Sequence, residues 1–300
     1  MAPTTASTCP CTTAGRVDAP GPPLRPGVDE HEVEVGERTH DAPESRDAAA
    51  AQGALWGRRA ADWAAVQEPL FVPVHEAVLA ELPKGGSVLD MGCGAGAFCH
   101  IASAAGMKVH GVDAAEGLVA IARERTSTGT FCVGDMRFTP YPDGSFDSVV
   151  GINSFGHAAD QMGVLGEARR VAIAGAVLAI VTWGAPEECD ATHLFDALGR
   201  VTGRIRRGSD RPADVALEEA VGRAGFTVRS ASSVPCPWTY PDDGTALRGV
   251  LSAGPFVAAA DAVGEERVRK AILDALGRFR GRTGYRLDNT FRLLTAVRAG

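Results

Sequence analysis

The 300-residue sequence has few lysines, few aromatic residues and no long apolar run. No stretch reaches the ~20 consecutive apolar residues of a membrane span, and no basic start precedes an apolar segment at the N-terminus. The net charge is −7, and no block of basic residues could neutralise nucleic-acid phosphates. These absences predict a soluble, cytoplasmic protein that binds neither membranes nor nucleic acid. They do not indicate an oligomeric state.

Metal-binding patterns and a foldable N-terminus are also missing. Cys9 and Cys11 have no cysteine or histidine partners at zinc spacing, and no two histidines have the spacing of a metal site. Residues 1–52 contain no aromatic residue, several prolines, and nine acids against four arginines. Such a segment cannot bury enough apolar surface to offset the entropy cost of ordering. We therefore expect no metal, a disordered tail over 1–52 and a folded domain over 53–300.

The most informative segment present is the run from Ser87 to Phe98, SVLDMGCGAGAF. It indicates an apolar strand that ends in a carboxylate and enters a glycine-rich turn, after which a helix begins. Glycines allow a positive φ or a close approach of the backbone to a ligand, and the helix start offers free N–H groups. The spacing also fits a dinucleotide fingerprint. However, Asp90 would repel a pyrophosphate and would attract a cationic ligand.

Two more carboxylates follow expected strand ends, Asp113 after 108–112 and Asp135 after 130–134. An acid in the position of Asp113 can accept hydrogen bonds from two ribose hydroxyls, which NAD and S-adenosylmethionine both have. The series Asp90, Asp113 and Asp135 suits a ligand with an ammonium, a ribose and an adenine amino group. S-adenosylmethionine has all three. A nicotinamide oxidoreductase is disfavoured by Asp90 and by the lack of a Tyr-x-x-x-Lys pair.

These motifs resemble those of class I S-adenosylmethionine-dependent methyltransferases, in the small-molecule branch related to quinone and sterol methyltransferases. The matching segments are LDMGCGAG (89–96), GVDAAEGLVAIAR (111–123), GDMRFTPYPDGSFDSVVGINSF (134–155) and AVLAIVTWG (176–184). The resemblance covers roughly 54–300 and is specific for the cofactor class, not for the substrate. It implies that the cofactor-binding residues are Asp90, Gly92, Gly94, Gly96, Asp113, Asp135, Met136 and Asn153.

Alternating strands and helices between Ser87 and Gly184 predict a parallel α/β sheet. The expected plan has N-terminal lid helices at 54–82, a cofactor-binding core at 85–184, cap and lid insertions at 185–283 and a final strand at 284–300. The resemblance implies a Rossmann-like fold with a central, mostly parallel seven-stranded sheet, an antiparallel last strand and a helical lid. Helices 54–82 and the insertion at 234–283 are the expected lid.

The loop after the fourth expected strand should face the substrate. It contains His157, which could remove a proton from a phenol, an enol or an amine, or could be an ordinary loop histidine. His193 is a more distant candidate. Aromatic residues at strand ends and in the lid could stack on a flat acceptor or could simply pack between lid and core. The candidate substrate-binding residues are Trp63, Phe155, Trp183, Trp238 and Tyr240.

The sequence thus predicts methyl transfer from S-adenosylmethionine to a small-molecule acceptor. The scarcity of lysine beside abundant arginine, alanine and glycine suggests a GC-rich genome and weakly suggests secondary metabolism. The alternative is the same cofactor-binding fold used for a non-methylating reaction, such as cyclisation, or for ligand binding. The glycine loop would be the same in either case. The atom that accepts the methyl group is not indicated.

Overall fold

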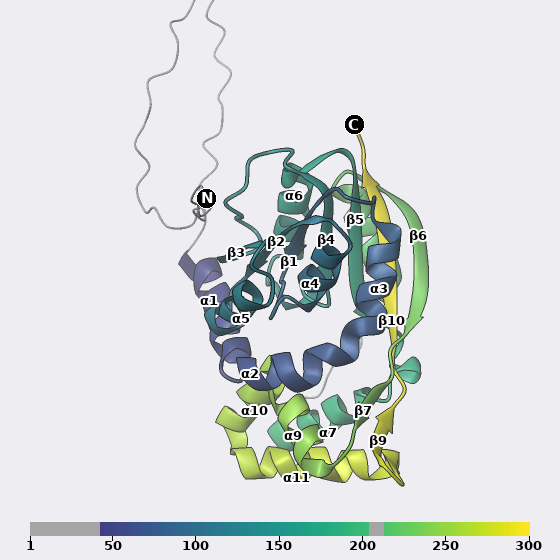
Figure 1. Ribbon diagram of the computed structural model, residues 1–300. Coiled ribbons are helices and arrows are strands. Elements are labelled where there is room, and N and C mark those ends of the chain that lie inside the picture. The colour runs from purple at the N-terminus through teal and green to yellow at the C-terminus, as the bar shows by residue number, and fades with distance from the viewer. Residues whose placement is uncertain (1–42, 204–212) are drawn as a thin grey trace, which may run out of the picture.

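Runs of β-branched and apolar residues form one large sheet at the centre of the computed structural model, which describes residues 43–203 and 213–300. The order of its seven strands is β3-β2-β1-β4-β5-β10-β6 (Figure 1). The strands are β1 (Ser87–Met91), β2 (Lys108–Asp113), β3 (Thr130–Val133), β4 (Phe146–Ile152), β5 (Ala172–Trp183), β6 (Phe226–Pro235) and β10 (Thr290–Arg298).

Strand direction confirms the predicted sheet. Neighbours from β3 through β5 are parallel, whereas β10 is antiparallel to both β5 and β6. Chain order reverses between β1 and β4, which pair side by side although two strands separate them in the sequence. In open α/β sheets, ligands bind at the carboxyl ends of the strands beside such a reversal.

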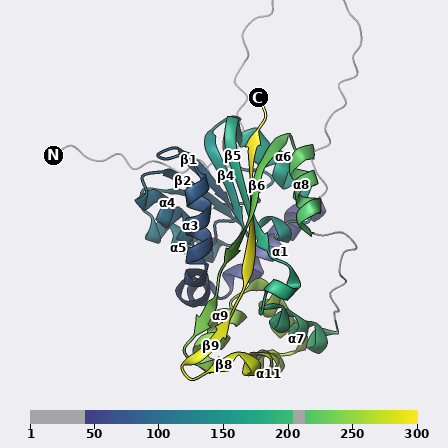
Figure 2. The same cartoon turned by 90° about the vertical axis from the view of Figure 1, so that its right-hand side faces the viewer.

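The helices of the described residues either cover the two faces of this sheet or form a second layer beside it (Figure 1, Figure 2). They are α1 (Pro43–Gly57), α2 (Ala60–Asp62), α3 (Val72–Glu81), α4 (Ala97–Ala104), α5 (Glu116–Arg125), α6 (Gln161–Val171), α7 (Thr192–Thr202), α8 (Ala213–Arg223), α9 (Asp243–Leu251), α10 (Gly254–Val263) and α11 (Glu265–Leu276). Successive strand residues point to opposite faces, so Val88 packs with α3 and α4 while Leu89 packs with α6 and α8. Figure 2 shows the two helix layers on either side of the sheet.

A second layer lies at the lower end of the view in Figure 1, where α7, α9, α10 and α11 gather around a small antiparallel sheet. Its strands are β7 (Trp238–Tyr240), β8 (Arg280–Gly281) and β9 (Gly284–Leu287). The buried side chains of this layer belong to the same core cluster as α3 and α4. The insertion therefore packs against the sheet domain and shares its core.

Several element boundaries differ from those that the sequence predicts. Helix α1 begins at Pro43, so the predicted start of order near Gly53 is wrong; residues 1–42 of the expected tail lie outside the described residues. The Ala-rich segment before Gly53 is helical because α1 packs on α5 and α10. The sequence indicates helical structure over 244–280, and the structure has three separate α-helices in this segment, with breaks at Ser252–Ala253 and at Gly264, where φ is +88°.

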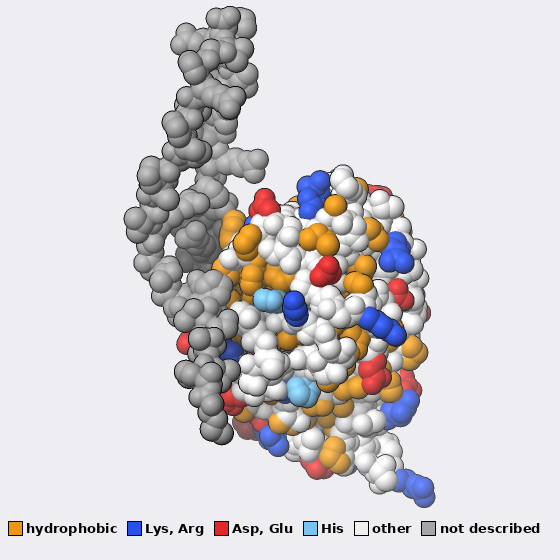
Figure 3. All heavy atoms as spheres, turned by 45° about the horizontal axis from the view of Figure 1, so that its top comes forward, with side chains coloured by type: hydrophobic (Ala, Val, Ile, Leu, Met, Phe, Trp, Pro, Cys, Tyr) orange, Lys and Arg blue, Asp and Glu red, His pale blue; other side chains and the backbone are white. Residues whose placement is uncertain are grey.

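Within the described residues, no single helix is long and apolar enough to span a bilayer, although α9 and α10 together meet that test with a 95° bend between them. On the face drawn in Figure 3, acidic and basic side chains are interspersed.

Candidate functional site

A cavity of about 280 Å³ lies at the carboxyl ends of β1, β2, β3 and β4. It is lined by the glycine-rich turn after β1, by the loops that follow the other three strands, and by residues of α1 and the helical segments after it. This is the position at which the strand order predicts a ligand site.

The glycine-rich turn depends on positive backbone φ and on close packing. Gly92 has φ +86°, and a Cβ atom there would lie 2.3 Å from the Cβ of Ser154. A Cβ on Gly94 would lie 3.1 Å from Oε1 of Glu68 and 3.5 Å from Nε1 of Trp63. The turn is therefore enclosed by the β4 loop on one side and by the N-terminal helices on another.

Gly96 has a different role from the one that the resemblance implies. It does not line the cavity, and a Cβ there would lie 2.8 Å from the Cβ of Ala122 in α5. Its φ of +80° allows α4 to begin close against α5. Gly96 thus packs against α5, and the structure does not place it at the cavity with the other predicted cofactor-binding glycines.

Three carboxylates gather at the cavity: Asp90 and Glu68 are buried, and Asp113 is half-buried. Asp113 accepts hydrogen bonds from the N–H groups of Gly94 and Ala115 at 2.9 and 2.8 Å. Asp90 is 2% exposed, and its Oδ1 has no hydrogen-bond partner. Burial, together with the charges of Asp113 and Glu68, raises the pKa of Asp90 to about 8. A cation in the cavity would relieve this repulsion.

Glu68 is the third carboxylate, and sequence reasoning missed it. Its Oε1 accepts the N–H of Ala95 in the glycine turn at 2.9 Å, and its Oε2 pairs with Arg125 of α5 at 2.5 Å. Burial raises the pKa of Glu68, and the Arg125 charge opposes that shift. The sequence offers one signal for Glu68, which is an acid in a mostly apolar helical stretch. However, its partners Ala95 and Arg125 lie 27 and 57 residues away, and the sequence does not indicate that they meet.

Asp135 and Met136 line the cavity as expected, but the Asp135 carboxylate is already paired. Both of its oxygens accept from the guanidinium of Arg137, which also lines the cavity. Sequence reasoning missed Arg137. Asp135 is therefore a paired acid, and its guanidinium partner also lines the cavity.

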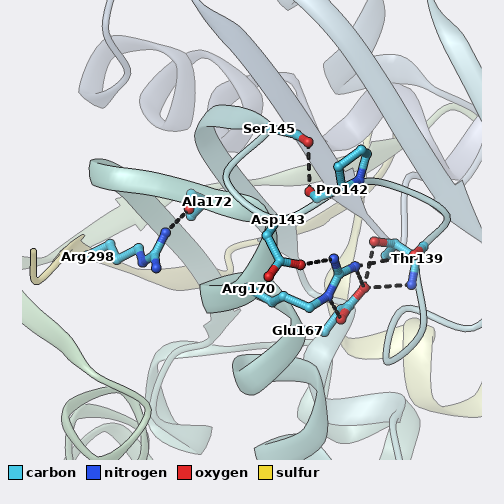
Figure 4. Close-up of polar contacts among 8 residues, drawn as sticks. All are labelled: Thr139, Pro142, Asp143, Ser145, Glu167, Arg170, Ala172 and Arg298. Carbon is cyan, nitrogen blue, oxygen red and sulfur yellow. Dashed lines mark hydrogen bonds and ion pairs between the residues drawn. The ribbon is translucent and has the colours of Figure 1, made fainter. Parts of the chain in front are cut away.

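A network beyond the cavity holds this β3–β4 loop in place (Figure 4). Oε1 of Glu167 in α6 accepts the backbone N–H and the hydroxyl of Thr139, both at 2.7 Å. Arg170 donates to both carboxylate oxygens of Glu167 and also to Asp143. Thr139 lies two residues after Arg137, so the network fixes the loop that presents Asp135 and Arg137.

We expect Glu167→Gln to lower the free energy of unfolding by about 2 kcal/mol, because it removes the charge that four donor groups share, the N–H and hydroxyl of Thr139 and two guanidinium nitrogens of Arg170. Affinity for the cavity's ligand should fall several-fold, because the loop at Asp135 loses its support. Asp143→Asn is the matched control. Asp143 contacts the same Arg170 but is 81% exposed, so it should cost under about 0.5 kcal/mol. Urea denaturation and calorimetric titration measure both; equal effects would contradict a loop-positioning role for Glu167.

The β4 loop supplies Asn153, Ser154 and His157 to the cavity. Asn153 has φ +53°, and its N–H donates to the carbonyl of Val181 at 2.9 Å. The hydroxyl of Ser154 donates to the carbonyl of Met91 at 2.6 Å, which joins this loop to β1. His157 is exposed at the rim, and its ring meets Trp56 edge-to-face at 5.2 Å. Partial burial lowers the pKa of His157, so the ring is neutral at pH 7.

A row of aromatic rings forms one side of the cavity. Ring centroids lie 4.9 Å apart for Trp56 and Trp63, 6.1 Å for Trp63 and Phe71, and 6.5 Å for Phe71 and His75. Phe98 follows, at 6.2 Å from His75. We call these five residues the aromatic wall; all five line the cavity. Of them, Trp63 is one of the candidate substrate-binding residues that the sequence predicts.

The other aromatic candidates do not reach the cavity. Trp183 and Trp238 pack on each other, with centroids 5.4 Å apart, and Trp238 packs behind Phe71. Tyr240 is 1% exposed and donates to Oε1 of Gln67, and Phe155 is buried in the core cluster under α6. The structure therefore does not bring these four predicted substrate-binding residues to the cavity. Large aromatic side chains fill the junction between the insertion and the sheet.

The structure brings one of the two predicted lid segments to the cavity. Residues of 54–82 line the cavity, but no described residue of 234–283 does. The insertion instead supports the N-terminal helices from behind: a Cβ on Gly254 would lie 2.7 Å from Trp56, and one on Gly249 would lie 2.9 Å from Gln67. The second half of the cover is α1, whose residues Ala48, Ala49 and Gln52 line the cavity.

Comparison with known proteins agrees with this geometry. Residues 89–180 match a family model described as a methyltransferase domain. The chain is 29% identical over 203 residues to the sterol 24-C-methyltransferase of Eremothecium gossypii, covering 61% of this chain and 54% of that protein. It is 36% identical over 107 residues to the ajmaline N-methyltransferase of Rauvolfia serpentina, covering 33% of this chain and 36% of that protein.

The chain contains a class I S-adenosylmethionine-dependent methyltransferase domain. Among solved structures, the YcgJ protein of Bacillus subtilis superposes with a TM-score of 0.54 at 19% identity, over 78% of this chain and all of that one, which shows the fold. The chain spans between about a third and about half of the length of the two curated relatives named above. The resemblance, the fold class and the cofactor predicted from the sequence are confirmed; the cofactor of the domain is S-adenosylmethionine.

The residues of the methyltransferase cavity fit that cofactor. Among the buried polar atoms of the cavity-lining residues, Nε1 of Trp63 and Oδ1 of Asp90 have no hydrogen-bond partner in the described residues. An amino-acid group carries both an acceptor for an indole N–H and a donor for a carboxylate. Gly94 lies between Trp63 and Glu68, and because it has no Cβ it leaves open the space between these two side chains.

Proposed function

We propose that this protein transfers a methyl group from S-adenosylmethionine to a small-molecule acceptor, within the general class EC 2.1.1.-, and that this serves secondary metabolism. The observation that carries the proposal is the cluster of Asp90, Glu68 and Asp113 around the glycine turn of a methyltransferase domain, in which two acids are buried and one oxygen of Asp90 is unpaired. The sterol, alkaloid and quinol acceptors named for its relatives support a small-molecule substrate. Cytoplasmic location stays a prediction from the sequence.

The cofactor, when bound, supplies a methyl group on a positively charged sulfur that is a good leaving group. In our proposal, Asp90 and Glu68 hold its ammonium and Trp63 donates to its carboxylate. Asp113 accepts from its ribose hydroxyls, and Met136 and the Asp135–Arg137 pair hold the adenine. Asn153 supports the β4 loop beside the reacting end. These residues act by orienting the cofactor, and orientation of reactants can lower a barrier by about 7–11 kcal/mol in ideal cases.

Turnover tests the proposal. Purified protein, S-adenosylmethionine and a panel of phenolic, indolic and amine acceptors should yield S-adenosylhomocysteine and methylated product in equal amounts. Asp113→Ala should weaken cofactor binding at least about tenfold, because it removes charge-assisted hydrogen bonds. Cofactor binding without any methylated product would favour the non-methylating alternative.

Cofactor binding should release a proton, because the free protein holds one on Asp90. With a pKa of about 8, Asp90 is protonated in about nine molecules of ten at pH 7, and a bound cation lowers that pKa. Affinity should therefore rise with pH between 6 and 8. Calorimetry at pH 7 in buffers of different ionisation enthalpy should show release of up to about 0.9 proton. Asp90→Asn should abolish the release, and an unchanged release in that variant would contradict this assignment.

A further inference from the structure

His75 is a buried histidine that the proposed cofactor contacts do not use. It lies on α3 within the aromatic wall, is 5% exposed and lines the cavity. Its Nδ1 has no partner, and its side chain makes no hydrogen bond to any described residue. Its ring instead lies between those of Phe71 and Phe98. A buried polar group without a partner is unfavourable, so a ligand that supplies the missing hydrogen bond would be selected.

The charges around His75 restrict what that ligand group can be. Burial and the nearby Arg125 lower the pKa of His75 to about 4, so the imidazole is neutral. Glu68 lies between Arg125 and the cavity, and Asp90 and Asp113 line it, which disfavours an anionic group. The one basic residue among the described lining residues, Arg137, is paired with Asp135. A cationic group near His75 would meet the charge of Arg125, which is close enough to His75 to lower its pKa.

We infer that His75 is a specificity residue, whose imidazole hydrogen-bonds an uncharged hydroxyl of a planar acceptor that stacks on the aromatic wall. The inference rests on the proposed function, because it places the methyl acceptor in this cavity. It narrows the substrate class to flat, neutral, hydroxyl-bearing molecules. It also assigns recognition of the acceptor to the N-terminal segment 56–75, because this segment supplies four of the five rings of the aromatic wall.

Three ligands that share one bicyclic ring system test this assignment. Binding of 2-naphthol, naphthalene and 2-naphthoate is measured by tryptophan fluorescence on full-length protein saturated with S-adenosylhomocysteine. Wild-type protein should bind 2-naphthol at least about tenfold more tightly than either of the others, as expected for one buried hydrogen bond and for an excluded charge. His75→Phe keeps a flat ring in place and should bring 2-naphthol to within about twofold of naphthalene. His75→Gln, which keeps a donor and an acceptor, should restore part of the difference.

Folding and cofactor binding are checked on the same variants. His75→Phe should keep cofactor affinity within about twofold of the wild-type value, because the proposed cofactor contacts do not include this residue. The pKa of His75 is 6.5 in the unfolded chain and about 4 in the folded protein, so the folded protein takes up this proton only at lower pH. As pH falls from 6.5 to about 4, protonation of His75 in the unfolded chain therefore destabilises the wild-type protein. The variant His75→Phe lacks this effect, so the difference between its melting temperature and the wild-type value should be more positive at pH 5 than at pH 7.5.

Three results would overturn the inference: no binding of 2-naphthol to the wild-type protein, an unchanged preference for it in His75→Phe, or binding of 2-naphthoate as tight as that of 2-naphthol. A tenfold loss of cofactor affinity in His75→Phe would also overturn it, because His75 would then belong to the cofactor site. If the naphthol preference behaves as expected but no acceptor is methylated, the proposed function fails and the binding assignment stands.

Discussion

Gly92→Ala should reduce the affinity for S-adenosylmethionine at least about a hundredfold, whereas Gly106→Ala should leave it within about twofold. Both glycines have nearly the same positive φ, +86° and +87°. An alanine at either site therefore imposes a similar backbone strain, about 1–2 kcal/mol. Their surroundings differ, because a Cβ on Gly92 would lie 2.3 Å from Ser154 while one on Gly106 has nothing within 4 Å.

The excess effect at Gly92 should come from the movement of Ser154. Its hydroxyl bonds to the carbonyl of Met91, so displacing it separates the β4 loop from the end of β1, where Asp90 and Asn153 face the cavity. Calorimetric titration gives the affinities, and thermal unfolding shows whether both variants fold. Equal affinities in the two variants would mean that the contact between the glycine turn and Ser154 does not shape the site.

The parts of the site that the sequence predicted are those set by local rules. An apolar run that ends in Asp90 and then in glycines must place that acid at the carboxyl end of a strand, and the same holds for Asp113 and Asp135. Parallel strands bring these ends to one edge. The cofactor-binding edge was therefore predictable without knowledge of the packing between helices.

The missed residues depend on packing between distant segments. Glu68 and His75 reach the cavity because the N-terminal helices cross the glycine turn, and no periodicity specifies that crossing. Conversely, Trp238 and Tyr240 are aromatic residues in an insertion, a pattern equally compatible with stacking on a ligand and with filling a core. The structure places them behind Phe71 and against Gln67, in the core. The start of α1 was missed for the same reason, because its Ala-rich sequence is stabilised by α5 and α10.

His157→Ala should lower kcat about a hundredfold for an acceptor that must lose a proton, and should leave cofactor affinity within about twofold. The side chain is exposed at the rim and has no hydrogen-bond partner among the described residues, so its removal should not disturb the glycine turn. Its lowered pKa keeps it neutral and able to take a proton at pH 7. As pH falls through that pKa, which lies below 6.5, protonation removes the base and kcat should decline.

Steady-state kinetics across pH 5 to 9 measure this role. The wild-type profile should have an acidic limb that the alanine variant lacks, and raising the pH should partly rescue the variant, because more of the acceptor is then already ionised. His193→Ala is the matched control: His193 lies on α7, contacts Arg278 and Phe279, and does not line the cavity. It should keep the wild-type kcat. If His157→Ala also keeps full turnover and the acidic limb, orientation of the acceptor against the cofactor would be sufficient for catalysis, with the released proton passing directly to water at the exposed rim.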